Sequence, residues 1–597
     1  MDGSRASGRR GMALVSALVA SFVAAAMISV VMTVAMSNNR QAQVARHRVS
    51  ARYMAEGALA SATKDIQTAV ANWEDVPTGG SVAIGEEMLE YTVTHTGLST
   101  ISTDRTGIQT LIDGYEILSI GTSGRSQEPM HKVINVRATP IFQFAVFYTN
   151  DLEIFPGPSM TLGGRVHTNE DLYIGCGNTL TVDTNYMGSV GKIYRERKDK
   201  PGISAGTVKV RRWVEDPYDA AEPEEYAVLH SQSQMLSLGV TTDSGYDSAF
   251  TEGVDLNGDG DFYDDDEWLP WGPGALEAFS QPMGYAGGEG STVLSEAHGV
   301  GEAEVPRIGS ISMYEESDIG DFVFDLDAGK YDPVATGTGT HSKGFFHKHA
   351  DLSIITYANG TWDAFDGDGY SVKGALAGVV TVSTIYDARQ ADGGASTTPV
   401  TEIDIDQLNA SGAFPDNGLI YAAHYDMGEG TNAKGIVLSN GEELKAPLTV
   451  VSEGPMYVQG DYNTVNKKGA AVIGDAINLL SNSWDGSKTS GNLPSASDTT
   501  YNMAIVTGNH ETHVGEYNGG LENLPRFHES WSGKDCFING SFVNTWESQF
   551  ATGKWKYGGD RYKAPGRKWA YDTDFNQVVN LPPFTPMAVT AEGVVTW

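Results

Sequence analysis

The sequence predicts a mostly β protein with one long N-terminal α-helix. Two observations carry this fold class: a single long apolar run near the N-terminus, and a glycine-rich remainder in which short apolar segments end at Gly or Asn. The chain has 597 residues, of which 70 are glycine, well above the usual share of about 7%. Glycine suits tight corners, and frequent Thr, Val, Asn and Tyr suit strands.

The apolar run covers residues 12–36 and contains no charged side chain. A helix of that length spans roughly 37 Å, which is enough to cross a bilayer. A secretory signal has a shorter apolar core of about 7–15 residues, followed by a cleavage site. We therefore expect a retained transmembrane segment. Arginines lie on both sides of it, so the positive-inside rule alone does not give its orientation.

The helical pattern continues past the membrane edge. Small and apolar residues keep a spacing of three to four up to Ile66, and no Gly or Pro interrupts residues 12–56. The sequence therefore predicts one helix over about 12–75, half in lipid and half outside. A bare anchor does not need the outer half, whereas a filament subunit does, because its helix packs against copies of itself.

A short basic leader ends at Gly11, and the apolar helix follows at once from Met12. This arrangement resembles the class III leader of type IV prepilins. The later stretch "RYMAEGALASA" (Arg52 to Ala62) resembles a segment of minor pilins of the PilX type. The resemblance implies cleavage after Gly11 by a prepilin peptidase and methylation of Met12. It also implies a single-pass protein of the bacterial inner membrane, with other pilin-like subunits and the pilus assembly machinery as partners.

Ser16 departs from the usual pilin pattern. Most pilins carry Glu five residues after the cleavage site, where it pairs with the N-terminal amine of a neighbour. The large minor pseudopilins at filament tips also lack this Glu, because a tip subunit has no neighbour above it. The resemblance thus implies a minor or tip role, and an ordinary signal-anchor with a chance Gly11 stays open as the alternative.

Two kinds of β region follow the helix. Residues 76–140 contain segments that alternate apolar and polar side chains, which predicts a small antiparallel sheet of the kind found in pilin heads. Residues 141–194 and 416–597 contain strands of about 3–5 residues that end at Gly or Asn, as in the rungs of a parallel β-solenoid. No strict period exists, so a β-sandwich remains the alternative. These two stretches also resemble bacterial pilus-associated proteins of unassigned function.

Residues 195–415 form an acidic insertion, which opens with a basic turn, Arg195 to Lys200, expected to be solvated. The insertion contains "DLNGDGDFYDDDEW", and calcium prefers six to eight oxygen ligands from such a tightly turning loop. The candidate calcium ligands are Asp255, Asn257, Asp259, Asp261 and Asp266. The sequence "LPWGPG" that follows ends any helix, so we expect a calcium loop outside an EF-hand pair, with a structural role. The alternative is a solvated acidic loop.

Weaker candidate sites lie elsewhere in the chain. The acidic stretch 363–369 has only part of a calcium pattern, and His347 and His349 would share a face if they lay on a strand, although surface positions are the favoured interpretation. Cys176 and Cys536 can form a disulfide only if the fold brings them together, and two separate thiols are favoured.

Charge and missing motifs limit the function. The formal net charge of -36 repels nucleic acid. No phosphate-binding loop, nucleophile elbow or zinc-protease motif is present, so we expect no enzyme. The expected function is a minor or tip pilin-like subunit that acts in assembly, surface display or adhesion, with a surface carbohydrate or protein as ligand. A surface-anchored polysaccharide-active solenoid enzyme and a plain envelope anchor are the alternatives.

Overall fold

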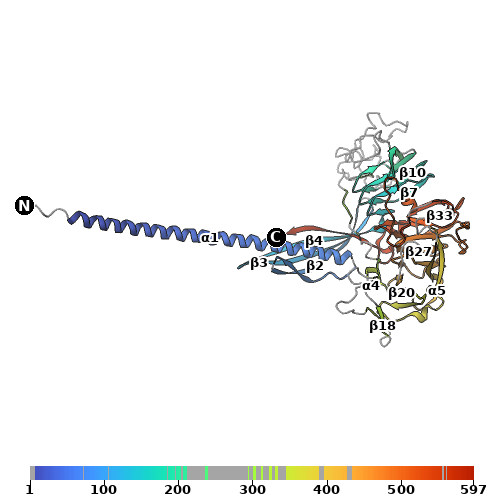
Figure 1. The fold of residues 1–597 in the computed structure, drawn as a ribbon, viewed down its shortest axis with the longest axis horizontal. Helices are drawn as coiled ribbons and strands as arrows, with labels where there is room; N and C mark the ends of the chain where they lie inside the picture. The colour runs from blue at the N-terminus through green and yellow to red at the C-terminus, as the bar shows by residue number, and fades with distance from the viewer. Residues whose placement is uncertain are drawn as a thin grey trace, which may run out of the picture.

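The structure is a computed structural model of the chain. It describes residues 7–71, 73–85, 87–104, 107–184, 186–194, 196–203, 206–211, 235–238, 293–294, 300–303, 305, 311–313, 322–325, 330–333, 344–388, 396–425, 433–553, 557–559 and 561–596. Within these ranges it confirms the predicted fold class, because one long N-terminal helix precedes regions built almost entirely of strands (Figure 1).

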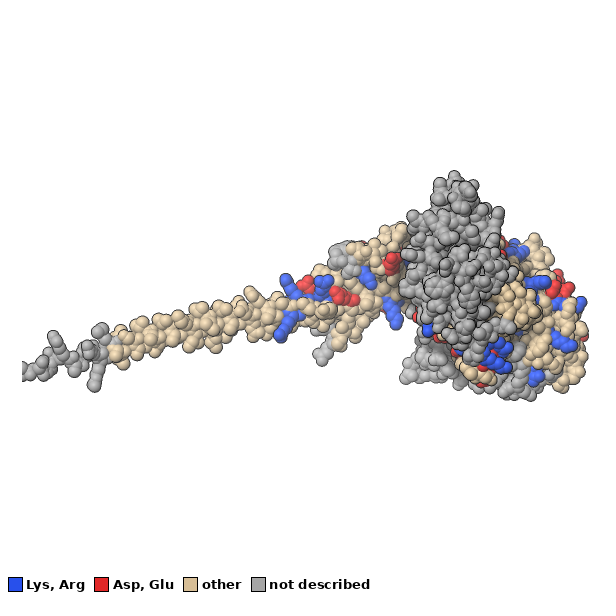
Figure 2. Space-filling model, turned by 90° about the horizontal axis from the view of Figure 1, so that it is seen from above, with Lys and Arg blue, Asp and Glu red and all other residues tan. Residues whose placement is uncertain are grey.

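Helix α1 (Ser7–Ala71) has two halves with different surroundings. Its most apolar window has a mean hydropathy of 2.5 and is 0% buried, and the helix is long and apolar enough to cross a membrane. Figure 2 shows this half as a rod without acidic or basic side chains. In the other half, buried side chains recur at helical spacing: Ala51, Ala55, Ala58, Leu59, Ala62, Ile66 and Ala69.

The second half of α1 packs against a five-stranded antiparallel sheet of order β1-β2-β3-β4-β36. Its strands are β1 (Gly79–Ile84), β2 (Glu87–Thr103), β3 (Gln109–Ser123), β4 (Ser126–Pro140) and β36 (Met587–Thr596). Helix and sheet approach so closely that a Cβ placed on Gly121 would lie 1.8 Å from the carbonyl oxygen of Ala51. Only glycine fits at that position.

Strand β36 comes from the end of the chain. The sequence placed it with the β-rich region 416–597, whereas it pairs with β4, with Met587 opposite Pro140. Figure 1 shows the C-terminus beside α1, in the stalk. The large β region is thus inserted between two neighbouring strands of the small sheet, and it both leaves and rejoins the stalk at one end of that sheet.

The inserted region is a parallel β-solenoid, which favours the expected solenoid over the sandwich. In its first part, successive turns stack Val146, Val166 and Met187 in parallel register. The strands of this part are β5 (Val146–Tyr148), β6 (Leu152–Ile154), β7 (Met160–Gly163), β8 (Val166–Thr168), β9 (Leu172–Ile174), β10 (Thr179–Asp183), β11 (Met187–Ser189), β12 (Ile193–Tyr194), β15 (Thr207–Arg211), β16 (Met235–Leu238) and β17 (Val293–Leu294). The first part therefore has three strands per turn, one on each face.

The second part of the solenoid begins at residue 352 and winds back toward the first. Strands on its first face are β20 (Leu352–Thr356), β21 (Trp362–Asp366), β24 (Leu419–His424), β26 (Leu448–Val451), β28 (Ala470–Gly474), β31 (Ala504–Thr507) and β34 (Phe542–Asn544). Strands on its other faces are β22 (Val380–Asp387), β23 (Ser396–Asp404), β25 (Gly435–Ser439), β27 (Pro455–Gln459), β29 (Ala476–Leu480), β32 (Pro525–Phe527), β30 (Thr499–Asn502), β33 (Asp535–Gly540) and β35 (Gly566–Tyr571). Solenoid strands thus occupy much of the C-terminal part of the expected insertion 195–415.

Shorter elements complete the described chain. They are the hairpins β13 (Glu196–Arg197) with β14 (Lys200–Ile203) and β18 (Phe322–Asp325) with β19 (Lys330–Pro333), and the short helices η1 (Ile141–Gln143), α4 (Phe345–His349), η5 (Lys373–Leu376), α5 (Ile405–Ala410), η7 (Leu521–Asn523), η8 (Thr573–Asn576) and η9 (Val578–Asn580).

The stalk and the solenoid are joined by more than the two connecting strands. The buried side chain of Gln143 forms two hydrogen bonds of 2.7 Å with the backbone of Gln109, one to the N–H and one to the carbonyl. The Lys348 ammonium of α4 lies 2.6 Å from the Glu74 carboxylate, just beyond the end of α1. These contacts fix the orientation of the solenoid on its stalk.

Candidate functional site: the seam of the solenoid

The two parts of the solenoid meet at a seam between β5 and β34. Phe542 pairs with Val146 in parallel register, and the N–H of Phe542 donates to the carbonyl of Ala145 at 2.8 Å. The buried Ser541 hydroxyl donates to the carbonyl of Phe144 at 2.6 Å. Since these partners lie about 400 residues apart in the chain, the seam forms only when both parts have folded.

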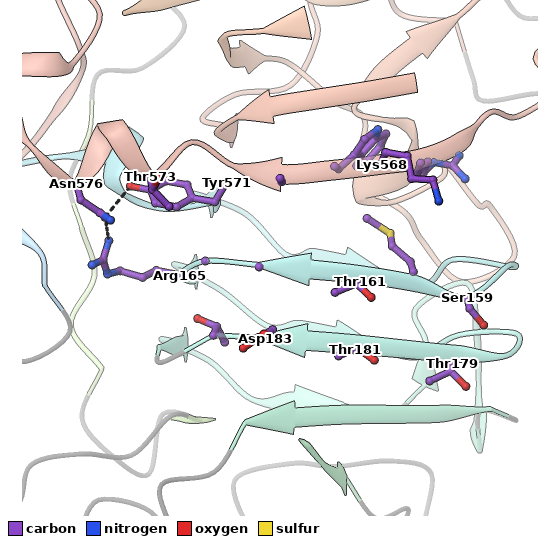
Figure 3. Close-up of a pocket in the computed structure, with 17 residues that line it drawn as sticks. Ser159, Thr161, Arg165, Thr179, Thr181, Asp183, Lys568, Tyr571, Thr573 and Asn576 are labelled. Carbon is purple, nitrogen blue, oxygen red and sulfur yellow. Dashed lines mark hydrogen bonds between the residues drawn. The ribbon is translucent and has the colours of Figure 1, made fainter. Parts of the chain in front are cut away.

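On another face, the seam is not closed by hydrogen bonds. Among the described strands, β7 pairs with β10 alone and β35 with β33 alone, so the edges of β7 and β35 meet without a ladder. A groove of about 860 Å³ lies here (Figure 3). Its lining includes Ser159, Thr161, Arg165, Thr179, Thr181, Asp183, Arg567, Lys568, Trp569, Tyr571 and Asn576.

Hydroxyl side chains of two neighbouring strands line part of this groove. Thr161 of β7 and Thr181 of β10 stand opposite each other in register. Figure 3 shows both on neighbouring strands, with Ser159 and Thr179 toward the same end of the sheet and Lys568 on β35 beside them. Thr161 and Lys568 are exposed, because alternate residues of a strand face opposite sides of the sheet.

One end of the groove is closed by a buried polar cluster. The guanidinium of Arg165 donates to the Gln143 carbonyl at 2.9 Å and to Asn576 Oδ1 at 2.7 Å. The Tyr571 hydroxyl donates to the same Asn576 oxygen at 3.1 Å. Burial lowers the pKa of Arg165, and burial raises the pKa of Tyr571. The Arg165 side chain therefore ties the stalk-proximal Gln143 to the C-terminal part of the solenoid.

Gly164 lets the two parts come together at this end. Its φ is +92°, and a Cβ placed on it would lie 2.7 Å from Tyr571 Cβ and 2.8 Å from Ala145 Cβ. Both the left-handed backbone and the close approach exclude an L side chain here. The glycine thus sets the width of the seam next to the groove.

The seam also contains a small polar cavity of about 20 Å³. Tyr148, Asp151, Glu153, Lys198 and Glu511 are among its lining residues. The Lys198 ammonium contacts both Asp151, from the first part of the solenoid, and Glu511, from the second. The basic turn 195–200, expected to be solvated, is therefore partly built into the seam, with Lys198 only 14% exposed.

Two buried carboxyl groups lie near this cavity. Glu153 and Glu522 are 4% and 6% exposed, and no hydrogen bond of normal geometry reaches their carboxyl oxygens in the described structure. Burial raises the pKa of Glu153 from 4.5 to about 7, while Thr512 and Arg197 oppose this shift. Burial likewise raises the pKa of Glu522 to about 7, with Arg567 opposing. The Glu153 carboxylate also raises the pKa of Glu522, and the Asp199 carboxylate raises that of Glu153.

The sites predicted from the sequence differ from the seam, as far as the structure describes them. Asp255, Asn257, Asp259, Asp261 and Asp266 lie outside the described residues. Within the described part of the chain, no group of three or more His, Cys, Asp or Glu side chains is arranged to hold a metal ion. Gly11 and Met12 lie within α1, which begins at Ser7.

The two cysteines are both free and buried, so no disulfide joins Cys176 to Cys536. Burial raises the pKa of the Cys536 thiol well above its ordinary value. This agrees with the favoured interpretation of two separate thiols, since each sulfur packs inside the solenoid core.

The weaker candidates have structural roles. In the acidic stretch 363–369, the Asp366 carboxylate accepts hydrogen bonds from the N–H groups of Asp368 and Tyr370 and so closes a turn. His347 and His349 lie on the short helix α4, not on a strand. His347 is buried and stacks on Tyr421 with ring centroids 4.6 Å apart, which corrects the expected surface position.

Comparisons with known proteins add little to this geometry. No protein-family model matches the chain, and no curated protein matches it. Among solved structures, the chain is similar to the competence-associated pilin ComZ from Thermus thermophilus. The match has 10% sequence identity and covers 92% of this chain and 97% of that chain, with a TM-score of 0.28. A score of that size does not establish a shared fold, so the functional argument rests on the chain itself.

Proposed function

We propose that this protein is a minor, tip-type pilin-like subunit that displays a β-solenoid head. The observation that carries this proposal is the stalk. Helix α1 is wholly exposed along its apolar half and buried along its other half against an antiparallel sheet that the C-terminal strand completes. An exposed apolar helix must be covered by lipid or by other helices, and a filament core supplies the second cover when the subunit leaves the membrane.

The size and position of the head favour a terminal place in the filament. Packed helices lie only about 8–10 Å apart, whereas the solenoid spreads well beyond the stalk on both sides in Figure 1. A head of that width would collide with its neighbours if every subunit carried one. Ser16, in place of the usual Glu, supports the same position, because a tip subunit has no neighbour above it to pair with.

Processing at Gly11 tests the proposal directly. The full-length protein should be shortened when it is co-produced with a prepilin peptidase, and the mature chain should begin at an N-methylated Met12. Intact mass measurement and N-terminal sequencing of the membrane-extracted protein check this. The variant Gly11→Val should stay uncut. If the chain keeps Met1 while a known prepilin in the same cells is cleaved, the protein is not a pilin-like subunit.

We also propose that the loop of Asp255 to Asp266 binds calcium with a structural role. Without a cation, its crowded carboxylates repel one another, and extracellular calcium modules bind with dissociation constants of roughly 10⁻⁴–10⁻³ M. Adding about 5 mM calcium should therefore protect the residues around the loop from limited proteolysis, and chelator should reverse this. The double variant Asp255→Asn, Asp259→Asn should lose the protection. Equal digestion of the parent protein with calcium and with chelator would contradict the site.

A further inference from the structure

The groove at the seam has a local charge opposite to that of the whole protein. The chain carries a formal net charge of -36. The charged side chains that line the groove, however, are the cations Arg165, Arg567 and Lys568 and a single carboxylate, Asp183. Arg165 is buried and already bonded within the protein, and Arg567 donates to the Glu522 carbonyl at 3.1 Å. Lys568 is therefore the exposed cation of the groove, and it forms no ion pair within the part of the chain that the structure describes. A cationic groove on an acidic protein attracts an anionic ligand locally.

The arrangement of hydroxyl groups narrows the chemistry of that ligand. Thr161, Thr179 and Thr181 lie on two hydrogen-bonded strands whose spacing is about 4.8 Å, and Ser159 directly precedes the first of them. They form a flat row of donors and acceptors beside the Lys568 ammonium (Figure 3). Such a row matches a ligand that carries many hydroxyl groups along its length as well as negative charges. A polymer of acidic sugars has both features, whereas an acidic peptide has only the charges.

We propose that this groove binds an acidic polysaccharide. Carboxylates of the sugar chain contact Lys568, and the sugar hydroxyl groups bond to Thr161 and Thr181. The lining comes from both parts of the solenoid, residues 159–184 and 567–576, so a bound chain bridges the seam and stabilises the folded head. This inference does not depend on the role of the stalk in a filament, and the uncleaved, full-length protein suffices to test it.

The test measures binding of the detergent-solubilised full-length protein to oligogalacturonate by isothermal titration calorimetry. Maltoheptaose serves as a neutral sugar and poly-L-glutamate as an acidic peptide. We expect oligogalacturonate to bind, to raise the melting temperature, and to bind more weakly as salt increases. Lys568→Gln should weaken binding about tenfold, and Thr161→Val with Thr181→Val about fivefold. Lys534→Gln serves as the matched control, because Lys534 is exposed but does not line the groove.

Four outcomes would overturn the inference. The first is no binding of oligogalacturonate at any salt concentration. The second is equal affinity for poly-L-glutamate, which would make the groove an acidic-peptide site, and the third is equal affinity for maltoheptaose. The fourth is binding that Lys568→Gln and the double threonine variant leave unchanged. The melting temperature of each variant is also measured without ligand. If it equals that of the parent protein, weaker binding results from a lost contact and not from misfolding.

Discussion

Replacing Glu522 or Glu153 by glutamine should stabilise the protein at pH 8 and leave its stability nearly unchanged at pH 5. Burial raises the pKa of each carboxyl from 4.5 to about 7. A carboxyl whose pKa is higher in the folded than in the unfolded protein contributes stability. This contribution is fully present below the unfolded-state pKa and is lost as pH rises through about 7. Above pH 7 each ionised, buried group costs roughly 2–3 kcal/mol, which glutamine does not incur.

Melting temperatures of the parent protein and the variants at both pH values check this prediction. The exposed Glu442→Gln is the matched control and should shift nothing at either pH. Because the Glu153 carboxylate raises the pKa of Glu522, the double variant Glu153→Gln, Glu522→Gln should gain less than the sum of the single changes. Equal destabilisation by Glu522→Gln at pH 5 and pH 8 would show that the carboxyl groups are paired and ionised, contrary to the structure.

Replacing Lys198 by methionine should cost about 3 kcal/mol of stability at neutral pH. The Lys198 ammonium contacts Asp151 and Glu511, and all three side chains are largely buried, with 14%, 11% and 24% exposed. Removing the cation leaves two carboxylates facing each other across the seam, and this penalty exceeds what the ion pairs themselves contribute. The partial exposure of Glu511 keeps the effect at the low end of the range for buried pairs.

Urea unfolding of the solubilised protein measures this effect. The compensated variant Lys198→Met, Asp151→Asn, Glu511→Gln carries no unpaired charge and should recover most of the loss. Arg197→Met is a useful comparison on the same turn, since Arg197 pairs with Asp199 at 2.8 Å and reaches the second part of the solenoid only through the face of the Tyr517 ring, 4.2 Å away, in the described structure. If Lys198→Met is neutral, the two parts of the solenoid are not held together by this cation.

Local sequence patterns were enough to predict the helix of the stalk and the fold class of the head. The helix could be predicted because Ala55, Leu59, Ala62 and Ile66 recur once per turn. The buried face of a helix therefore appears as a short-range pattern in the sequence. The solenoid was expected for a similar reason, since a short strand that ends at Gly or Asn can be recognised from a few consecutive residues. The distance between Cys176 and Cys536 in the sequence favoured two separate thiols, and the calcium loop remains a prediction.

The groove could not be predicted from the sequence, because its parts lie about 400 residues apart. The strand Gly566–Tyr571 gave one signal, two adjacent cations in an acidic chain, but nothing in it points to Thr161 or Thr181. Similarly, Lys198 belongs to a basic turn that looks like a solvated surface until Asp151 and Glu511 come into contact with it. Residues that the winding of the solenoid brings together from distant parts of the chain leave no periodic pattern in the local sequence.

The sequence by itself determined the exposed apolar helix, the outer half that packs, and the parallel β character of the head, because each depends on side-chain periodicity over a few turns. Only the tertiary structure decided that Met587 returns to pair with Pro140, that the head is inserted into the stalk sheet, and that its two parts close at Phe542 and Val146. Backbone pairing between distant strands uses the same N–H and C=O groups in every residue, so the identity of the partner strand is set by the whole fold.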